Sequence, residues 1–137
     1  MEVWKEFGEN VITHSAAHHL LTILELTGSR GYARVTDVAR HLGITTGSVS
    51  TNLKALKQRG LVVEDENKFL SLSPAGTAMA QEILNQRIIL KSFFVNVLGV
   101  TEEQAEIDAC KTEHLLSEET TSKMAALEKK LVKTKAK

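Results

Sequence analysis

The sequence predicts a mainly α-helical protein in which a winged helix-turn-helix is followed by an all-helical half. Three observations lead to this fold class. Two apolar repeats with helical spacing are separated by one glycine, Gly43. Two short apolar runs joined by a polar segment come next, as in a hairpin. Beyond these runs, helix-start signals recur at Ser73, Thr101 and Ser117.

The three N-terminal helices follow from apolar spacing. The first is expected over residues 11–26 and closed by Gly28 and Gly31, with its inner side formed by Ala16, Leu20, Ile23, Leu24 and Thr27. The second is predicted by Val35, Val38, Ala39 and Leu42, and Gly43 ends it. The third has an inner stripe of Val49, Leu53 and Leu56, and it ends at Gly60.

The later elements follow from turn and cap signals. Residues 61–63 and 69–72 read as the two strands of the wing. Ser73 and Pro74 begin a long helix to about Leu98, because proline suits the first turn. Thr101 begins a helix to about Leu116, and Ser117 one through Leu131. We therefore expect a DNA-binding domain over residues 1–72 and a helical dimerisation and metal-sensing domain over residues 73–137.

The outer face of the third helix is rich in short polar side chains. Hydroxyl and amide groups near a helix start suit base edges and phosphates in a major groove. From Arg30 to Gly60 six residues are basic and only Asp37 is acidic, although the whole chain is neutral. A local positive field of this kind is typical of DNA-binding proteins. The predicted DNA contacts are Arg34, Thr45, Thr46, Ser48, Ser50, Thr51, Asn52, Lys54, Lys57 and Arg59.

The predicted wing differs in charge from this helix. Glu64, Asp65 and Glu66 stand at its tip and would repel phosphate. We therefore expect the helix, and not the hairpin tip, to contact double-stranded DNA. Because DNA half-sites usually come in pairs, the all-helical second half is expected to form a homodimer.

Composition excludes several classes. No apolar run reaches the roughly 18 residues of a membrane span. Residues 1–10 have no apolar segment typical of a signal peptide. The chain has one cysteine, which excludes an internal disulfide and fits a reducing compartment. These features predict a cytoplasmic protein that does not bind membranes.

A cluster of metal-ligand residue types lies in the acidic segment from Thr101 to Thr120, which holds seven acids and one base. On a helix, Cys110, Glu113 and His114 would share one face, and Glu106 would join them one turn earlier. Thiolate, carboxylate and imidazole together form a donor set for a divalent transition metal. His18 in the first helix is the best candidate to complete the site, with His14 and His19 beside it.

These motifs together resemble the DtxR/MntR family of iron- and manganese-dependent repressors. The resemblance runs in order from about Ser15 to Leu131 and includes the segments GYARVTDVA (31–39), RGLV (59–62), LGV (98–100), DAC (108–110) and EHLLS (113–117). It implies a homodimeric transcriptional regulator that acts as a repressor and is not an enzyme. In this family a divalent metal couples the N-terminal helix to the dimerisation domain and sets the spacing of the DNA-reading heads. The chain ends where the short, MntR-like members end, without the SH3-like domain of longer ones.

The resemblance assigns ligand roles residue by residue. Cys110, Glu113 and His114 match metal-ligating positions, and His18 falls where members place Met or Asp. Two departures matter: Arg87 falls where the family has a ligating histidine, and Leu21 replaces a carboxylate of the manganese-type members.

Lys91 is a further departure, because it falls near a position where a second carboxylate ligand is common. Basic side chains cannot ligate a cation, so a two-metal site is not expected. Two alternatives stay open. One metal per subunit binds His18, Cys110, Glu113 and His114, or the metal is lost and Arg87 pairs with Glu113 or Glu106. The family implies Fe(II) or Mn(II), whereas a thiolate with two imidazoles favours iron, cobalt or zinc.

Two other functions fit parts of the sequence. A metal-independent winged-helix regulator could sense oxidants through Cys110, whose pKa Lys111 would lower and the carboxylates would raise. A zinc hydrolase would need an open ligand position and a general base, but the chain has no H-E-x-x-H helix.

Overall fold

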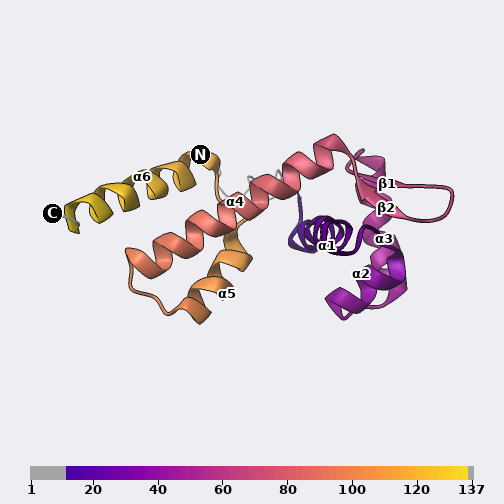
Figure 1. The fold of residues 1–137 in the computed structure, drawn as a ribbon, viewed down its shortest axis with the longest axis horizontal. Coiled ribbons are helices and arrows are strands. Elements are labelled where there is room, and N and C mark those ends of the chain that lie inside the picture. The colour runs from indigo at the N-terminus through magenta and orange to yellow at the C-terminus, as the bar shows by residue number, and fades with distance from the viewer. Residues whose placement is uncertain (1–11, 136–137) are drawn as a thin grey trace, which may run out of the picture. The chain divides into compact units, whose positions relative to one another are not determined.

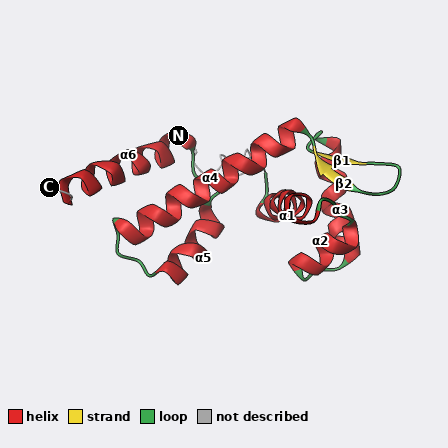
Figure 2. Cartoon of the chain, in the orientation of Figure 1, coloured by secondary structure: helices red, strands yellow, loops and turns green. Residues whose placement is uncertain are grey.

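The computed structural model describes residues 12–135, which are mainly helical (Figures 1 and 2). In chain order these residues form α1 (His14–Arg30), α2 (Val35–Leu42), α3 (Thr46–Gln58), β1 (Val62–Glu64), β2 (Leu70–Leu72), α4 (Pro74–Asn96), α5 (Glu102–Thr112) and α6 (Glu118–Lys135). The predicted fold class, a winged helix-turn-helix followed by helices, is confirmed. The expected lack of a signal peptide concerns residues 1–10, which lie outside the described part.

The chain divides into two compact units, one ending at Glu82 and the other running on from Ile83. The division falls within α4, and each unit is described by itself below. The boundary expected after residue 72 divides a DNA-binding domain from a dimerisation domain, and it differs from the division between the compact units. This functional boundary stays a prediction. Among the described residues, no helix combines the length and the apolar character that crossing a membrane requires.

The C-terminal end of helix α1 lies later in the chain than the sequence predicts. The Thr13 hydroxyl accepts a 3.1 Å hydrogen bond from the Ala16 N–H and so caps the start. The helix passes through Gly28 and ends at Gly31, whose φ of +83° is the left-handed cap conformation. The buried face differs in part from the predicted one, since Leu20 and Ile23 are buried but Ala16, Leu24 and Thr27 are only half-buried. The other buried residues of α1 are Ala17, His19, Leu21, Thr22 and Leu26.

The helix-turn-helix matches its prediction closely. Helix α2 ends at Gly43, which has φ +69°, and the Gly43 N–H bonds the Ala39 carbonyl. The predicted inner stripe of α3, Val49, Leu53 and Leu56, is buried. Helix α1 packs against α2, α3 and β2, so these side chains form one aliphatic core.

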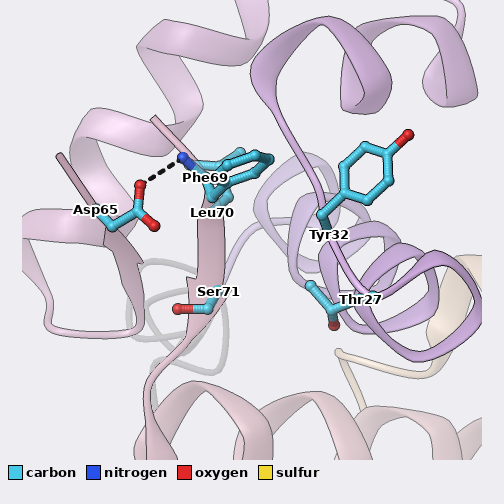
Figure 3. Close-up of a pocket in the computed structure, with 7 residues that line it drawn as sticks. Thr27, Tyr32, Asp65, Phe69, Leu70 and Ser71 are labelled. Carbon is cyan, nitrogen blue, oxygen red and sulfur yellow. Dashed lines mark hydrogen bonds between the residues drawn. The ribbon is translucent and has the colours of Figure 1, made fainter. Parts of the chain in front are cut away.

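The wing is a short antiparallel hairpin in which Val62 pairs with Leu72 and Glu64 with Leu70. Its tip is built around one carboxylate, because Asp65 Oδ1 accepts hydrogen bonds of 2.9 Å from the backbone N–H groups of both Asn67 and Phe69. Figure 3 shows the bond to Phe69. Lys68 lies in this tip with φ +67°, a left-handed conformation that costs a lysine more than a glycine.

Helix α4 begins directly against the loop after α3. The Ser73 hydroxyl donates to the Gly60 carbonyl (2.6 Å) and accepts from the Gly76 N–H (3.0 Å), so the predicted Ser73 cap is confirmed. A Cβ added at Gly76 would lie 2.0 Å from the Leu61 carbonyl oxygen. Glycine at this position therefore allows the two backbones to approach each other. The helix ends at Asn96 rather than Leu98.

The last two helices begin where predicted. The Thr101 hydroxyl accepts from the Gln104 N–H at 3.2 Å, and the Ser117 hydroxyl accepts from the Thr120 N–H at 3.2 Å. Helix α5 ends at Thr112, four residues before the predicted end, whereas α6 continues to Lys135, beyond Leu131. The early end of α5 changes the geometry of the predicted metal ligands.

Candidate DNA-binding and metal-binding sites

The N-terminus of α3 is an exposed, well-capped polar surface. The Thr45 hydroxyl accepts from the Ser48 N–H (3.1 Å) and donates to the Ser48 hydroxyl (3.0 Å). This cap satisfies a backbone donor that the first turn of a helix otherwise leaves open. Of the ten residues predicted to contact DNA, Asn52 is half-buried, and the exposed ones are Arg34, Thr45, Thr46, Ser48, Ser50, Thr51, Lys54, Lys57 and Arg59.

Local hydrogen bonds hold two of the polar side chains on α3. The Thr51 hydroxyl donates to the Gly47 carbonyl (3.0 Å), and the Asn52 amide donates to the Ser48 carbonyl (3.1 Å). A hydroxyl or amide that donates once still keeps acceptor capacity for a base or a water molecule. The surface is therefore ordered before any ligand binds, which lowers the entropy lost on binding.

Arg34 is held at the junction between α2 and the wing. Its guanidinium lies 4.3 Å from the centroid of the Phe69 ring and donates to the Asn67 carbonyl at 3.3 Å. The backbone N–H of Arg34 donates to the Asp37 carboxylate at 3.0 Å. The positive charge of Arg34 is thus held in place by a cation–π contact with Phe69.

The acidic wing tip has structural partners. Glu64 forms a 2.7 Å ion pair with Lys57 of α3, and Asp65 is occupied by the backbone of the turn. The repulsion expected from three acids is therefore reduced, but Lys57 is also partly neutralised. Beside the wing lies an open pocket of about 500 Å³ that includes Tyr32 and Phe69, whose rings meet edge to face at 6.0 Å (Figure 3).

The candidate metal ligands of the C-terminal unit lie around the end of α5. Cys110 is half-buried in the helix, and Glu113 is buried at its C-cap with φ −56° and ψ −29°. His114 lies in the turn that follows. The expectation that all three share one face of a continuous helix is therefore wrong for His114, because α5 ends at Thr112. Their roles as ligands stay predictions.

Both predicted carboxylate ligands are paired with bases of α4. Arg87 donates to the two oxygens of Glu113 at 2.5 and 2.9 Å, and the Glu113 side chain is 0% exposed. Lys91 lies 2.7 Å from Glu106 at an exposed position. The Arg87–Glu113 pair that the sequence offered as one alternative is therefore present. It also raises the pKa of Arg87, which stays charged.

Electrostatics at Cys110 favour the neutral thiol. Burial raises the pKa of Cys110, and the negative charge of Glu113 raises it further, while Arg87 acts in the opposite direction. Without a metal the thiol is thus protonated at neutral pH. A cation that bound its sulfur would have to displace that proton.

Helix α1 carries the candidate histidines of the N-terminal unit. The rings of His14 and His18 meet edge to face with centroids 4.4 Å apart. His19 is buried, and its Nδ1 lies 2.7 Å from the Ser15 carbonyl oxygen. Because that oxygen can only accept, Nδ1 carries the proton and Nε2 is left as an acceptor. Among the described residues no hydrogen-bond partner of His19 Nε2 was found.

The burial of His19 was not evident from the sequence. Apolar periodicity treats histidine as a polar residue, so no signal marked His19 as buried. Its protonated Nδ1 leaves Nε2 in the form that binds metals. His19 Nε2 is thus a buried nitrogen acceptor within α1.

The residues present fit a divalent ion that prefers nitrogen and sulfur. The thiol of Cys110 and the imidazoles of His18 and His114 are such donors, and they suit zinc, cobalt or iron. The two carboxylates are held by cations, so the structure does not offer the oxygen-rich surroundings that manganese prefers.

Comparison with known families separates the chain into two matched regions. Residues 13–68 match a family model described as MarR family, which covers the winged helix-turn-helix. Residues 73–134 match a model described as the metal binding and dimerisation domain of the iron dependent repressor.

Curated relatives cover most of the chain. The HTH-type transcriptional regulator MntR of Lysinibacillus sphaericus is 30% identical over 115 residues, which span 84% of this chain and 82% of that protein. An uncharacterized HTH-type transcriptional regulator of Methanocaldococcus jannaschii is 34% identical over 86 residues, which span 63% of this chain and 69% of that one.

Solved structures support the same fold. A hypothetical protein of Sulfolobus solfataricus aligns with a TM-score of 0.72 at 22% identity, covering 85% of this chain and 88% of that one. The manganese regulator SloR aligns with a TM-score of 0.73 at 20% identity, covering 82% of this chain but 52% of its own length. The chain thus spans about half the length of SloR.

The two matched regions occur in the order expected from the motifs and cover both halves of the chain. The relatives are transcriptional regulators and not enzymes. Identity to a relative over most of both chains extends this conclusion beyond the fold. The chain therefore belongs to the DtxR/MntR family of metal-dependent transcriptional regulators.

Proposed function

We propose that the chain acts as a homodimer that binds paired half-sites of double-stranded operator DNA when each subunit holds one divalent ion. The observation that carries this proposal is the capped, exposed N-terminus of α3 in a chain whose residues 73–134 match a metal binding and dimerisation domain. As the family implies, the sense of regulation is repression, and the place of action is the cytoplasm.

The DNA-binding part of the proposal is supported by α3. Thr45, Ser48 and Thr51 present hydroxyls at the first turns of the helix, where they can reach base edges in a major groove. Lys54 and Arg59 add exposed positive charge for the phosphates. Arg34, fixed on Phe69, supplies a further cation beside the wing.

The metal-binding part is supported by the donors of both units. Cys110 and His114 are the proposed ligands of the C-terminal unit, and His18 is the proposed ligand of α1. Glu113 and Glu106 were also predicted as ligands, but each would first have to leave its basic partner. When bound, the ion supplies a crosslink between groups that lie on different helices. Metal affinity and DNA affinity must then be coupled by the same factor in both directions.

The proposed homodimer is supported by apolar surface on the C-terminal unit. Helix α6 exposes Leu127, Leu131 and Val132, and α5 exposes Ile107. Large aliphatic side chains that lie together on one exposed helix are typical of a protein interface. Residues 73–134, which include α6, match a region described as a dimerisation domain.

The thiol-sensing alternative is disfavoured by the surroundings of Cys110. Reactive cysteines are deprotonated at neutral pH, whereas burial and Glu113 raise the pKa of this thiol. DNA affinity that changes with peroxide but not with a chelator would revive this alternative. The remote alternative of a zinc hydrolase has no observation in its favour.

The proposal can be tested with duplexes selected from random DNA in the presence of Zn(II). We expect wild-type protein to bind the selected duplex with zinc and to lose at least tenfold in affinity with EDTA. His114→Ala should remove this metal dependence. Glu103→Ala, which removes an exposed acid of α5, is the control and should keep this metal dependence. DNA binding that is equal with zinc and with EDTA would refute the proposal.

A further inference from the structure

Two basic side chains on one face of α4 form ion pairs with one acid of α5 and with the acid at its C-cap. Arg87 and Lys91 are one helical turn apart, and they pair with Glu113 and Glu106 respectively. The two pairs differ in their surroundings. The Glu113 side chain is 0% exposed and that of Arg87 is 25% exposed, whereas Lys91 and Glu106 are 40% and 50% exposed. Only the Arg87 pair is therefore shielded from water and salt.

The buried pair uses the whole carboxylate group. Arg87 Nε donates to one oxygen of Glu113, and a terminal guanidinium nitrogen donates to the other at 2.9 Å. Such a bidentate contact is the strongest geometry available to a guanidinium and a carboxylate. A metal ion that took Glu113 as a ligand would leave the partly buried guanidinium of Arg87 without its counter-charge. That arrangement is strongly unfavourable, because removing one partner of a buried pair leaves an uncompensated charge.

We propose that Arg87 determines the metal specificity of this chain by withholding the Glu113 carboxylate from any bound ion. The guanidinium itself provides the positive charge that links α4 to Glu113, so that no cation is needed there. The inference rests on the proposed metal-activated function and adds the residue that restricts the ion. With Glu113 withheld, the proposed donors are sulfur and nitrogen atoms, which favour Zn(II) or Co(II) over Mn(II).

The test is to release Glu113 and measure which ion gains affinity. Arg87→Met keeps an unbranched apolar stem but removes the guanidinium. We expect it to raise Mn(II) affinity at least tenfold, while Zn(II) affinity, measured by competition with a chromophoric chelator, changes less than threefold. Lys129→Met removes a positive charge from an exposed position of α6 and should leave both affinities within threefold of wild type.

A complementary variant removes the carboxylate instead. Glu113→Gln in wild-type background should bind Zn(II) with unchanged stoichiometry, because the carboxylate is not a ligand. If Glu113→Gln loses Zn(II), or if folded Arg87→Met gains no Mn(II) affinity, the inference is wrong. Should Arg87→Met fail to fold, Arg87→Lys keeps the charge without the bidentate contact, and it should gain Mn(II) affinity to a smaller, still measurable extent.

Failure of the proposed function and failure of the inference about Arg87 would give different results. Failure of the proposed function would appear as DNA binding by wild-type protein that ignores added metal. Failure of the present inference would appear as an unchanged ratio of Mn(II) to Zn(II) affinity in Arg87→Met that still binds metal. Electron paramagnetic resonance of Mn(II) provides a readout that does not depend on DNA.

Discussion

Lys57, in the last turn of α3, donates a 2.7 Å hydrogen bond to the carboxylate of Glu64 in the first strand of the wing. This ion pair links α3, the helix predicted to contact DNA, to the hairpin. It also places a negative charge beside a lysine that the sequence assigned to DNA. The structure therefore predicts that the pair limits the affinity for DNA.

Replacing Glu64 with glutamine should strengthen DNA binding. Lys57 would then be available to a phosphate, so the slope of log affinity against log salt should steepen by about 0.9. Fluorescence anisotropy at several salt concentrations measures both quantities. Glu66→Gln, which removes an equal charge from the wing tip, is the control. A Glu66→Gln variant with the same gain would show that net charge, and not the pair, is responsible.

Replacing Gly76 with alanine should destabilise the N-terminal unit. The added Cβ would meet the Leu61 carbonyl at 2.0 Å, so the backbones must separate, at a cost of about 1–3 kcal/mol as for other overpacked positions. Urea denaturation measures the loss. Gly28→Ala is the matched control, because a Cβ there meets nothing within 4 Å, and it should gain about 0.4–1 kcal/mol. Equal stability of the two variants would contradict the close approach.

Replacing Thr45 with alanine should weaken both folding and DNA binding. The change removes the cap of α3 and leaves the Ser48 N–H without its side-chain acceptor, at a cost of about 1 kcal/mol. Thr51→Ala removes an equivalent hydroxyl from the middle of the same helix, where it caps nothing, and should cost less than half as much. Equal melting temperatures of Thr45→Ala and Thr51→Ala would rule out the capping role of Thr45.

Metal binding should depend on pH through Cys110. Burial raises the pKa of this thiol, so an ion that binds its sulfur releases one proton. Between pH 7 and 8.5, Zn(II) affinity should rise about tenfold for each pH unit, because one thiol proton leaves for each ion bound. Cys110→Ser should bind more weakly with little pH dependence over this range. If Zn(II) affinity depends on pH equally in wild type and in Cys110→Ser, the thiolate is excluded as a ligand.

The helix-turn-helix could be predicted because its signals are local. Gly43 ends α2 in the left-handed conformation, and the spacing of Val49, Leu53 and Leu56 defines the buried face of α3. Both signals lie within one or two turns of the residues they describe. The wing and the cap at Ser73 were predicted for the same reason.

The candidate metal site was predicted less well because its geometry depends on distant contacts. No glycine or proline marks the end of α5, so the sequence allowed the helix to continue past Thr112. Glu113 instead bonds Arg87, which lies 26 residues earlier in the chain. The resemblance identified Arg87 as a departure and offered this pair as an alternative, but spacing alone could not decide between a ligand and an ion-pair partner.

Lys68 adopts φ +67° at the tip of the wing, where a glycine would fit without strain. Lys68→Gly would therefore give a more robust scaffold but a less positive hairpin. An engineer who selects variants of this chain for heat resistance alone should recover that replacement readily.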